Sequence, residues 1–186
     1  MPSARRLASA FPSVVLAALL TSGTAAVAAA EHPASPRIIR EQMFGVARLY
    51  EYAVRCGAAP AQSRGLLALH ETNLHFFKAL DDLRSLHRDA TTRQEAEIRV
   101  DLLPRDLDGA ASLDDVTTGW KQGLAEADAH DKPSAKLCQT VMEALPQGDG
   151  VAAKAAADLL PRSKELEQHA ADLSGRLKGQ RDAARK

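Results

Sequence analysis

The sequence predicts an all-α fold: a single-domain bundle of five or six helices, closed by one disulfide. Three observations lead to this prediction. Apolar residues recur at helical spacing in successive segments, glycine, proline or capping patterns separate the segments, and the chain has only two cysteines. After the first 30 of its 186 residues, 156 remain. A domain of this size is large enough to bury a substantial core.

Residues 1–30 have the features of a cleaved secretory signal peptide. Arg5 and Arg6 form a positive segment, and residues 11–20 (FPSVVLAALL) form a short apolar core. The small residues before Glu31 fit the cleavage rule, which places the cut before Glu31. The alternative is a membrane anchor, but the apolar run is shorter than the about 20 residues that span a bilayer. We expect a periplasmic or alternatively secreted protein, with no stable membrane insertion after cleavage.

Charge excludes one class of partner. Without the two arginines of the leader, 22 of the 24 basic residues remain against 24 acidic residues, a formal charge of −2. This balance gives no support for nucleic-acid binding. We expect no nucleic-acid partner and propose instead that the partner is another envelope or secreted protein.

Cys56 and Cys138 are predicted to form a disulfide, because an exported chain folds in an oxidising compartment. The bond would close a loop of 82 residues, which on the chain-entropy model stabilises by at most about 4–5 kcal/mol. The alternative is a reactive or intermolecular thiol pair. No C-x-x-C pattern and no neighbouring histidine supports that alternative.

The first half of the chain predicts three helices after a mobile lead-in at 31–36. Residues 38–57 form a two-faced helix with Gly57 as its C-cap, and residues 61–87 form the second helix. Residues 92–103 are interpreted as a third helix with a capping box, although a short strand is the alternative. Within the second helix Asn73 stands in the apolar line, either bonded to a neighbouring helix or facing a pocket.

The second half predicts a helix at 112–130, a short helix at 134–145, a turn at 146–150 and an alanine-rich helical segment at 151–186. Pro161 is expected to kink or split that last segment. In the 112–130 helix, Gly119 and Gly123 flank Trp120, and we expect them to allow close approach of another backbone.

The predicted domain organisation is a helical domain at 37–178 followed by a fraying basic tail at 179–186. The pentapeptide DLLPR occurs at 101–105 and again at 158–162. Similarity does not extend on either side, so coincidence is favoured over a duplicated hairpin.

No motif for catalysis or for a cofactor is found. The stretch HETNLH places His70 and His75 five residues apart, whereas two zinc ligands on one helical face need a spacing of four. Phosphate-binding glycine loops, a nucleophile elbow and a haem-attachment motif are also absent from the sequence. We therefore expect no metal, no cofactor, no catalytic residue and no enzymatic activity.

The leading functional hypothesis is a protein-binding or accessory protein of the cell envelope, such as an inhibitor or immunity protein, an assembly factor or a stress chaperone. The alternative is a carrier or sensor of a small hydrophobic ligand, with His70, Asn73 and Trp120 lining a pocket between helices. A third, less favoured hypothesis is a small all-helical secreted enzyme with charged residues that converge only in the fold.

Overall fold

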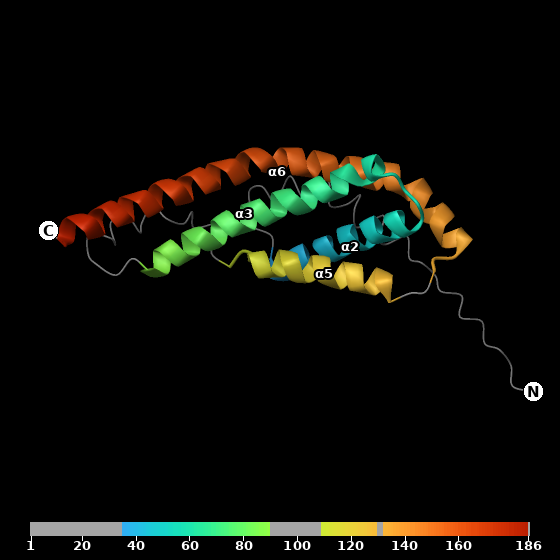
Figure 1. Ribbon diagram of the computed structural model, residues 1–186, viewed down its shortest axis with the longest axis horizontal. Coiled ribbons are helices and arrows are strands. Elements are labelled where there is room, and N and C mark those ends of the chain that lie inside the picture. The colour runs from blue at the N-terminus through green and yellow to red at the C-terminus, as the bar shows by residue number, and fades with distance from the viewer. Residues whose placement is uncertain (1–34, 90–108, 130–131, 186) are drawn as a thin grey trace, which may run out of the picture.

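The computed structural model describes residues 35–89, 109–129 and 132–185, and within them the fold is all-α (Figure 1). In these ranges, four α-helices and one 3₁₀ turn belong to a single domain. In chain order they are α2 (Pro36–Arg55), the 3₁₀ turn η1 (Pro60–Ser63), α3 (Arg64–Asp89), α5 (Leu113–Asp128) and α6 (Ala135–Ala184). The all-α class is confirmed, but the expected number of five or six helices is not found among the described residues.

The helices associate as two parallel pairs, α2 with α5 and α3 with α6. Near the start of α2, Arg40 forms an ion pair with Asp115 of α5 at 3.0 Å, and near its end Arg55 donates a hydrogen bond to the carbonyl of Ala127. Figure 1 shows α2 and α5 running in one direction, and α3 and α6 together in the other.

Contacts near the start, middle and end of α3 and α6 show that these two helices are also parallel. Gly65 lies beside Asp149, His75 beside Glu167, and Asp89 beside Arg181, so both helices advance together. Apolar side chains from all four helices form one core between the pairs. Its largest fully buried members are Met43, Val46, Leu66, Leu80, Leu83, Val116, Leu145 and Leu173.

The two glycines of α5 bring its backbone against that of α2, as the sequence predicts. A Cβ atom on Gly119 would collide with the carbonyl of Arg40, and one on Gly123 would collide with the carbonyl of Phe44. Both glycines are buried. The absence of a side chain therefore sets the distance between these two helices.

The start of α5 is fixed by polar contacts as well as by its cap. Ser112 and Asp115 form the expected capping box, with the Ser112 N–H donating to Asp115 Oδ2 at 2.9 Å. Arg84 of α3 donates to the carbonyls of Ala110 and Ala111 at 2.6 and 3.0 Å. These bonds attach the segment leading into α5 to the end of α3.

The prediction of a short helix at 134–145 and a turn at 146–150 is wrong, because α6 is one helix of 50 residues. At about 1.5 Å per residue it is roughly 75 Å long. Tertiary contacts override the local preference: the missing side chain of Gly148 makes room for Leu49, and Asp149 accepts hydrogen bonds from the first N–H groups of α3.

Pro161 does not split α6 either. Pro146 and Pro161 both lie inside the helix and both are exposed. A proline in a helix leaves the carbonyl four residues earlier without its N–H partner, and at an exposed position water can hydrate that carbonyl. Figure 1 shows α6 as a continuous, gently arched helix along the molecule.

Cys56 and Cys138 form the predicted disulfide, with an S–S distance of 2.04 Å. Cys56 is the C-cap of α2, and Cys138 lies in the first turn of α6, which Ser134 caps. The bond therefore joins the C-cap of α2, in one helix pair, to the first turn of α6, in the other.

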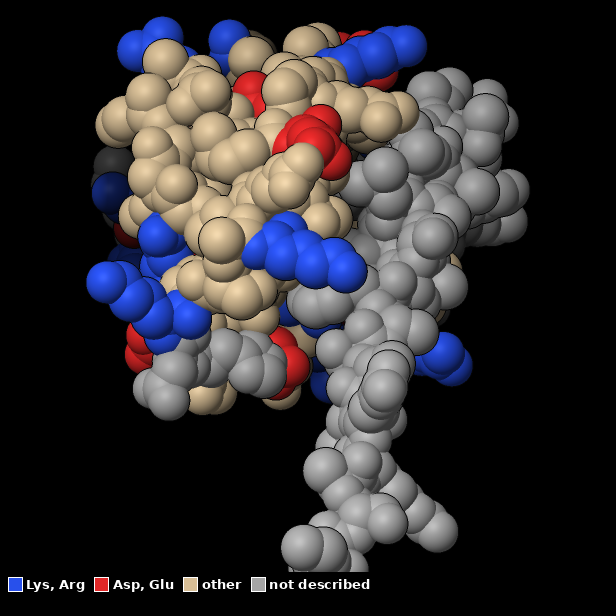
Figure 2. Space-filling view, turned by 90° about the vertical axis from the view of Figure 1, so that its right-hand side faces the viewer, with Lys and Arg blue, Asp and Glu red and all other residues tan. Residues whose placement is uncertain are grey.

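At the disulfide end of the molecule, both uncharged and charged side chains reach the surface. Figure 2 shows this end, where tan side chains dominate the area not covered in grey and charged side chains are scattered. The stretch 56–63 between α2 and α3 contains no charged residue.

Several predictions fall on residues outside the described ranges. They concern the signal peptide at 1–30, most of the lead-in, the third helix at 92–103 and the first copy of DLLPR at 101–105. Among the described helices, none is long and apolar enough to cross a bilayer.

Candidate functional site

His70 and Trp120, two of the predicted pocket residues, are brought together at the junction of the two helix pairs. Their rings stack face to face, with centroids 3.8 Å apart and planes 8° apart. Tyr50 of α2 lies on the same tryptophan, with ring centroids 5.8 Å apart. One aromatic cluster therefore joins α2, α3 and α5.

The environment of His70 favours its neutral form. Burial lowers its pKa from the ordinary value of 6.5, and the nearby carboxylate of Glu71 acts in the opposite direction. The Nδ1 atom is buried and has no hydrogen-bond partner within the described part of the chain. A charge on this ring would lose hydration that the surrounding side chains do not replace.

For Asn73, the third predicted pocket residue, the sequence leaves open a bond to a neighbouring helix, but none is found among the described residues. Its side-chain nitrogen donates to the carbonyl of Leu69 in its own helix at 2.8 Å. Asn73 is 6% exposed. Its amide nitrogen is therefore engaged by the backbone one turn earlier.

A shallow groove of about 620 Å³ lies elsewhere, along the seam between α3 and α6. Small side chains form part of its lining: Ala79 from α3, and Ala170, Ala171 and Ser174 from α6. Ala79 and Ala170 are buried, whereas Ala171 and Ser174 are exposed. Leu86 adds a larger, partly buried apolar side chain at one end.

Charged side chains line the same groove in pairs. Lys78 donates to Asp82 along α3 at 2.6 Å, and His75 Nδ1 lies 3.0 Å from Glu167 Oε1 across the two helices. The hydrogen bond from Lys78 to Asp82, followed by their charge attraction, raises the pKa of Lys78. All four side chains are exposed. The groove therefore has an alanine and serine floor and a charged rim.

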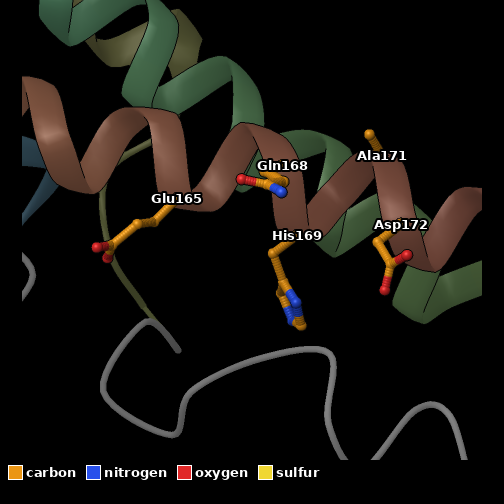
Figure 3. A pocket seen from close by; sticks show the side chains of 5 residues that line it. All are labelled: Glu165, Gln168, His169, Ala171 and Asp172. Atoms are coloured by element: carbon orange, nitrogen blue, oxygen red, sulfur yellow. The ribbon is translucent and has the colours of Figure 1, made fainter.

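A second hollow lies along α6 alone (Figure 3). Glu165, His169 and Asp172 project to the same side of the helix in that view. Gln168 and Ala171 complete the described lining, all of which comes from one helix. Among the described residues this hollow has no second wall, so it is a weaker candidate than the α3–α6 groove.

Residues 35–89, 109–129 and 132–185 contain no group of three or more His, Cys, Asp or Glu side chains that could hold a metal ion.

The groove was not identified from the sequence. A helical projection of α3 places Ser85 and Ala79 on opposite sides of Lys78 and Asp82, so all four residues share one face. The projection could not show which part of α6 lies opposite, because that depends on the parallel pairing.

Comparisons of the chain with protein-family models, with curated proteins and with solved structures find no match. The candidate site therefore rests on the geometry of this chain.

Proposed function

We propose that this protein is an exported, non-enzymatic binding protein of the cell envelope. Its α3–α6 groove would hold an amphipathic helix of another envelope or secreted protein. The observation that carries this proposal is the groove itself, in which small side chains lie between two parallel helices. Where helix surfaces carry alanine and serine, a further helix can approach closely and bury apolar area along the seam.

The charged rim indicates the chemistry of the partner helix. Exposed ion pairs such as Lys78–Asp82 and His75–Glu167 contribute little to stability, so exchanging one member for a partner's charge costs little. A partner helix with an acidic residue opposite Lys78 and a basic residue opposite Glu167 would complement both walls. Its central face would carry small or apolar residues that meet Ala79, Ala170 and Ala171.

Two further observations support the setting. The Cys56–Cys138 disulfide is consistent with an oxidising compartment, and the leader sequence is typical of an exported chain. The proposal therefore places the protein in the periplasm, with secretion as the alternative. The small-ligand hypothesis is less well supported, because His70 and Trp120 cover each other's faces and Asn73 bonds its own backbone.

Site-specific photo-crosslinking in the cell envelope tests the proposal. A benzophenone amino acid at Ala171 is expected to capture one defined protein, whereas the same probe at Ala157 captures none. Both positions are exposed alanines of α6, but only Ala171 lines the groove. Mass spectrometry then identifies the partner helix that was crosslinked. In the same experiment, the protein that carries the probe is expected to begin at Glu31.

A synthetic peptide covering that helix is then titrated against the purified protein. Ala171→Trp fills the groove and is expected to weaken binding at least about tenfold, or about 1.4 kcal/mol, with Ala157→Trp as the matched control. Equal crosslinking at both positions, or peptide binding that Ala171→Trp leaves unchanged, would show that the groove is not the binding site.

A further inference from the structure

The first turns of α6, residues 135–147, form a segment attached differently from the rest of that helix. The next part of α6 is fixed to α3, because Asp149 Oδ1 accepts hydrogen bonds from the N–H groups of Gly65 and Leu66 at 2.6 and 3.1 Å. The preceding turns extend past the start of α3 toward the end of α2. There the disulfide joins Cys138 to Cys56.

Side-chain hydrogen bonds within this segment are local. Ser134 Oγ accepts from the N–H of Leu137, Gln139 donates to Glu143, and Thr140 donates to the carbonyl of Lys136. Toward the rest of the molecule the segment contributes the buried side chains of Val141 and Leu145. Apolar packing and the disulfide are therefore the ties that hold these turns against α2.

The junction between the segment and the fixed part of α6 is intrinsically weak as a helix. Residues 146–150 (PQGDG) contain a proline, which cannot donate a backbone hydrogen bond, and two glycines, which favour other conformations. Gly148 packs beside Leu49, but Gly150 is exposed and has open space around its Cα. Packing does not require glycine at position 150. At this position, glycine therefore only weakens the helix.

We propose that the Cys56–Cys138 disulfide is a redox latch on this segment. With the latch closed, α6 is continuous through residues 146–150. With it open, these residues act as a hinge, and the segment 135–147 detaches from α2 and exposes Leu49, Val141 and Leu145.

Opening requires a dithiol reductant, such as a reduced thiol–disulfide oxidoreductase. Its thiolate attacks one sulfur of the Cys56–Cys138 bond and forms a mixed disulfide, and its second thiol then resolves that bond. Two electrons pass to the protein, which gains two protons and leaves with two thiols, while the reductant becomes a disulfide. Both cysteines are partly exposed, so an attacking thiolate can reach them.

Hydrogen exchange on the native protein, oxidised and then treated with dithiothreitol, tests the latch. Reduction is expected to speed amide exchange at 137–148 by about tenfold or more, and to leave the middle of α3 and α5 within about twofold. Reoxidation is expected to restore the original pattern. The double variant Cys56→Ser/Cys138→Ser is expected to reproduce the reduced pattern without reductant.

Gly150→Ala separates a hinge from general loosening. Alanine favours the helix at this open position, so the variant is expected to reduce the faster exchange of the reduced protein several-fold. The control Gly175→Ala also meets open space on α6, but it lies outside the hinge. It should therefore leave the faster exchange of the reduced protein at 137–148 within about twofold.

Three results would overturn the proposal. If reduction raises amide exchange equally in all helices, the disulfide stabilises the whole fold and not this segment alone. Exchange that does not change on reduction would leave the segment held by packing alone. If dithiothreitol does not reduce the Cys56–Cys138 disulfide in the native protein, a latch that works in the folded state is ruled out.

Discussion

The two helix pairs are held together in opposite ways. In the α2–α5 pair, Gly119 and Gly123 bring one backbone directly onto the other. In the α3–α6 pair, leucine and alanine side chains separate the backbones along most of the seam, and a groove remains on one side. Close approach also occurs in the second pair, but at Gly65 near its start.

This difference indicates which of the two seams has room to bind a partner. A contact between backbones leaves no space and tolerates no added atom, so the seam between α2 and α5 offers no room for a partner at Gly119 and Gly123. A seam of small side chains can accept another surface without moving its helices. The candidate site accordingly lies on α3 and α6.

The largest expected effect comes from adding one methyl group to the glycine contact. Gly123→Ala should destabilise by about 2–3 kcal/mol, because the Cβ would collide with the Phe44 carbonyl and the Ala47 side chain. Gly175→Ala, the control in open space on α6, should instead stabilise by about 0.5–1 kcal/mol. Urea unfolding of both variants measures the effect. Equal changes of the same sign would contradict the account of the α2–α5 contact.

A smaller effect is expected where α6 caps the start of α3. Asp149→Ala should cost about 1–2 kcal/mol, because the N–H groups of Gly65 and Leu66 lose their acceptor. Asp149→Asn keeps an acceptor oxygen and should lose less than half as much. Thermal unfolding at neutral pH distinguishes the two variants. If they are equally destabilised, the charge rather than the hydrogen bonds provides the stabilisation.

The smallest effect concerns the junction between the pairs. Because burial lowers the pKa of His70, the unfolded chain takes up a proton at a higher pH than the folded protein does. The stabilisation that neutral His70 contributes to the folded protein is therefore fully present above pH 6.5. It is lost as the pH falls through the pKa of His70 in the folded protein. His70→Gln should flatten this part of the pH dependence in urea titrations between pH 7.5 and 5. An unchanged slope would show that other groups cause it.

Local patterns were sufficient to predict much of the fold. The apolar stripes located α2, α3 and α5 to within a few residues, and the two cysteines, together with the expectation of export, predicted their bond. The small-residue positions Gly119 and Gly123 predicted a close contact, because a glycine inside a helix usually has a packing reason.

What could not be predicted depends on contacts between distant segments. Residues 146–150 favour a turn, yet Leu49 and the start of α3 hold them in a helix. Asn73 has a bonding partner within its own helix that polarity alone does not reveal. The groove exists because Ala79 and Ala170 meet across the seam, and their pairing follows from topology.

The parallel pairing also has a consequence for how the chain folds. Arg40 meets Asp115, and Gly65 meets Asp149 across 84 residues, so each helix contacts its main partner only after most of the chain exists. Closing such long loops before any contact forms slows folding. A chain with this pairing therefore remains unfolded for longer after synthesis than one whose neighbouring helices pair first.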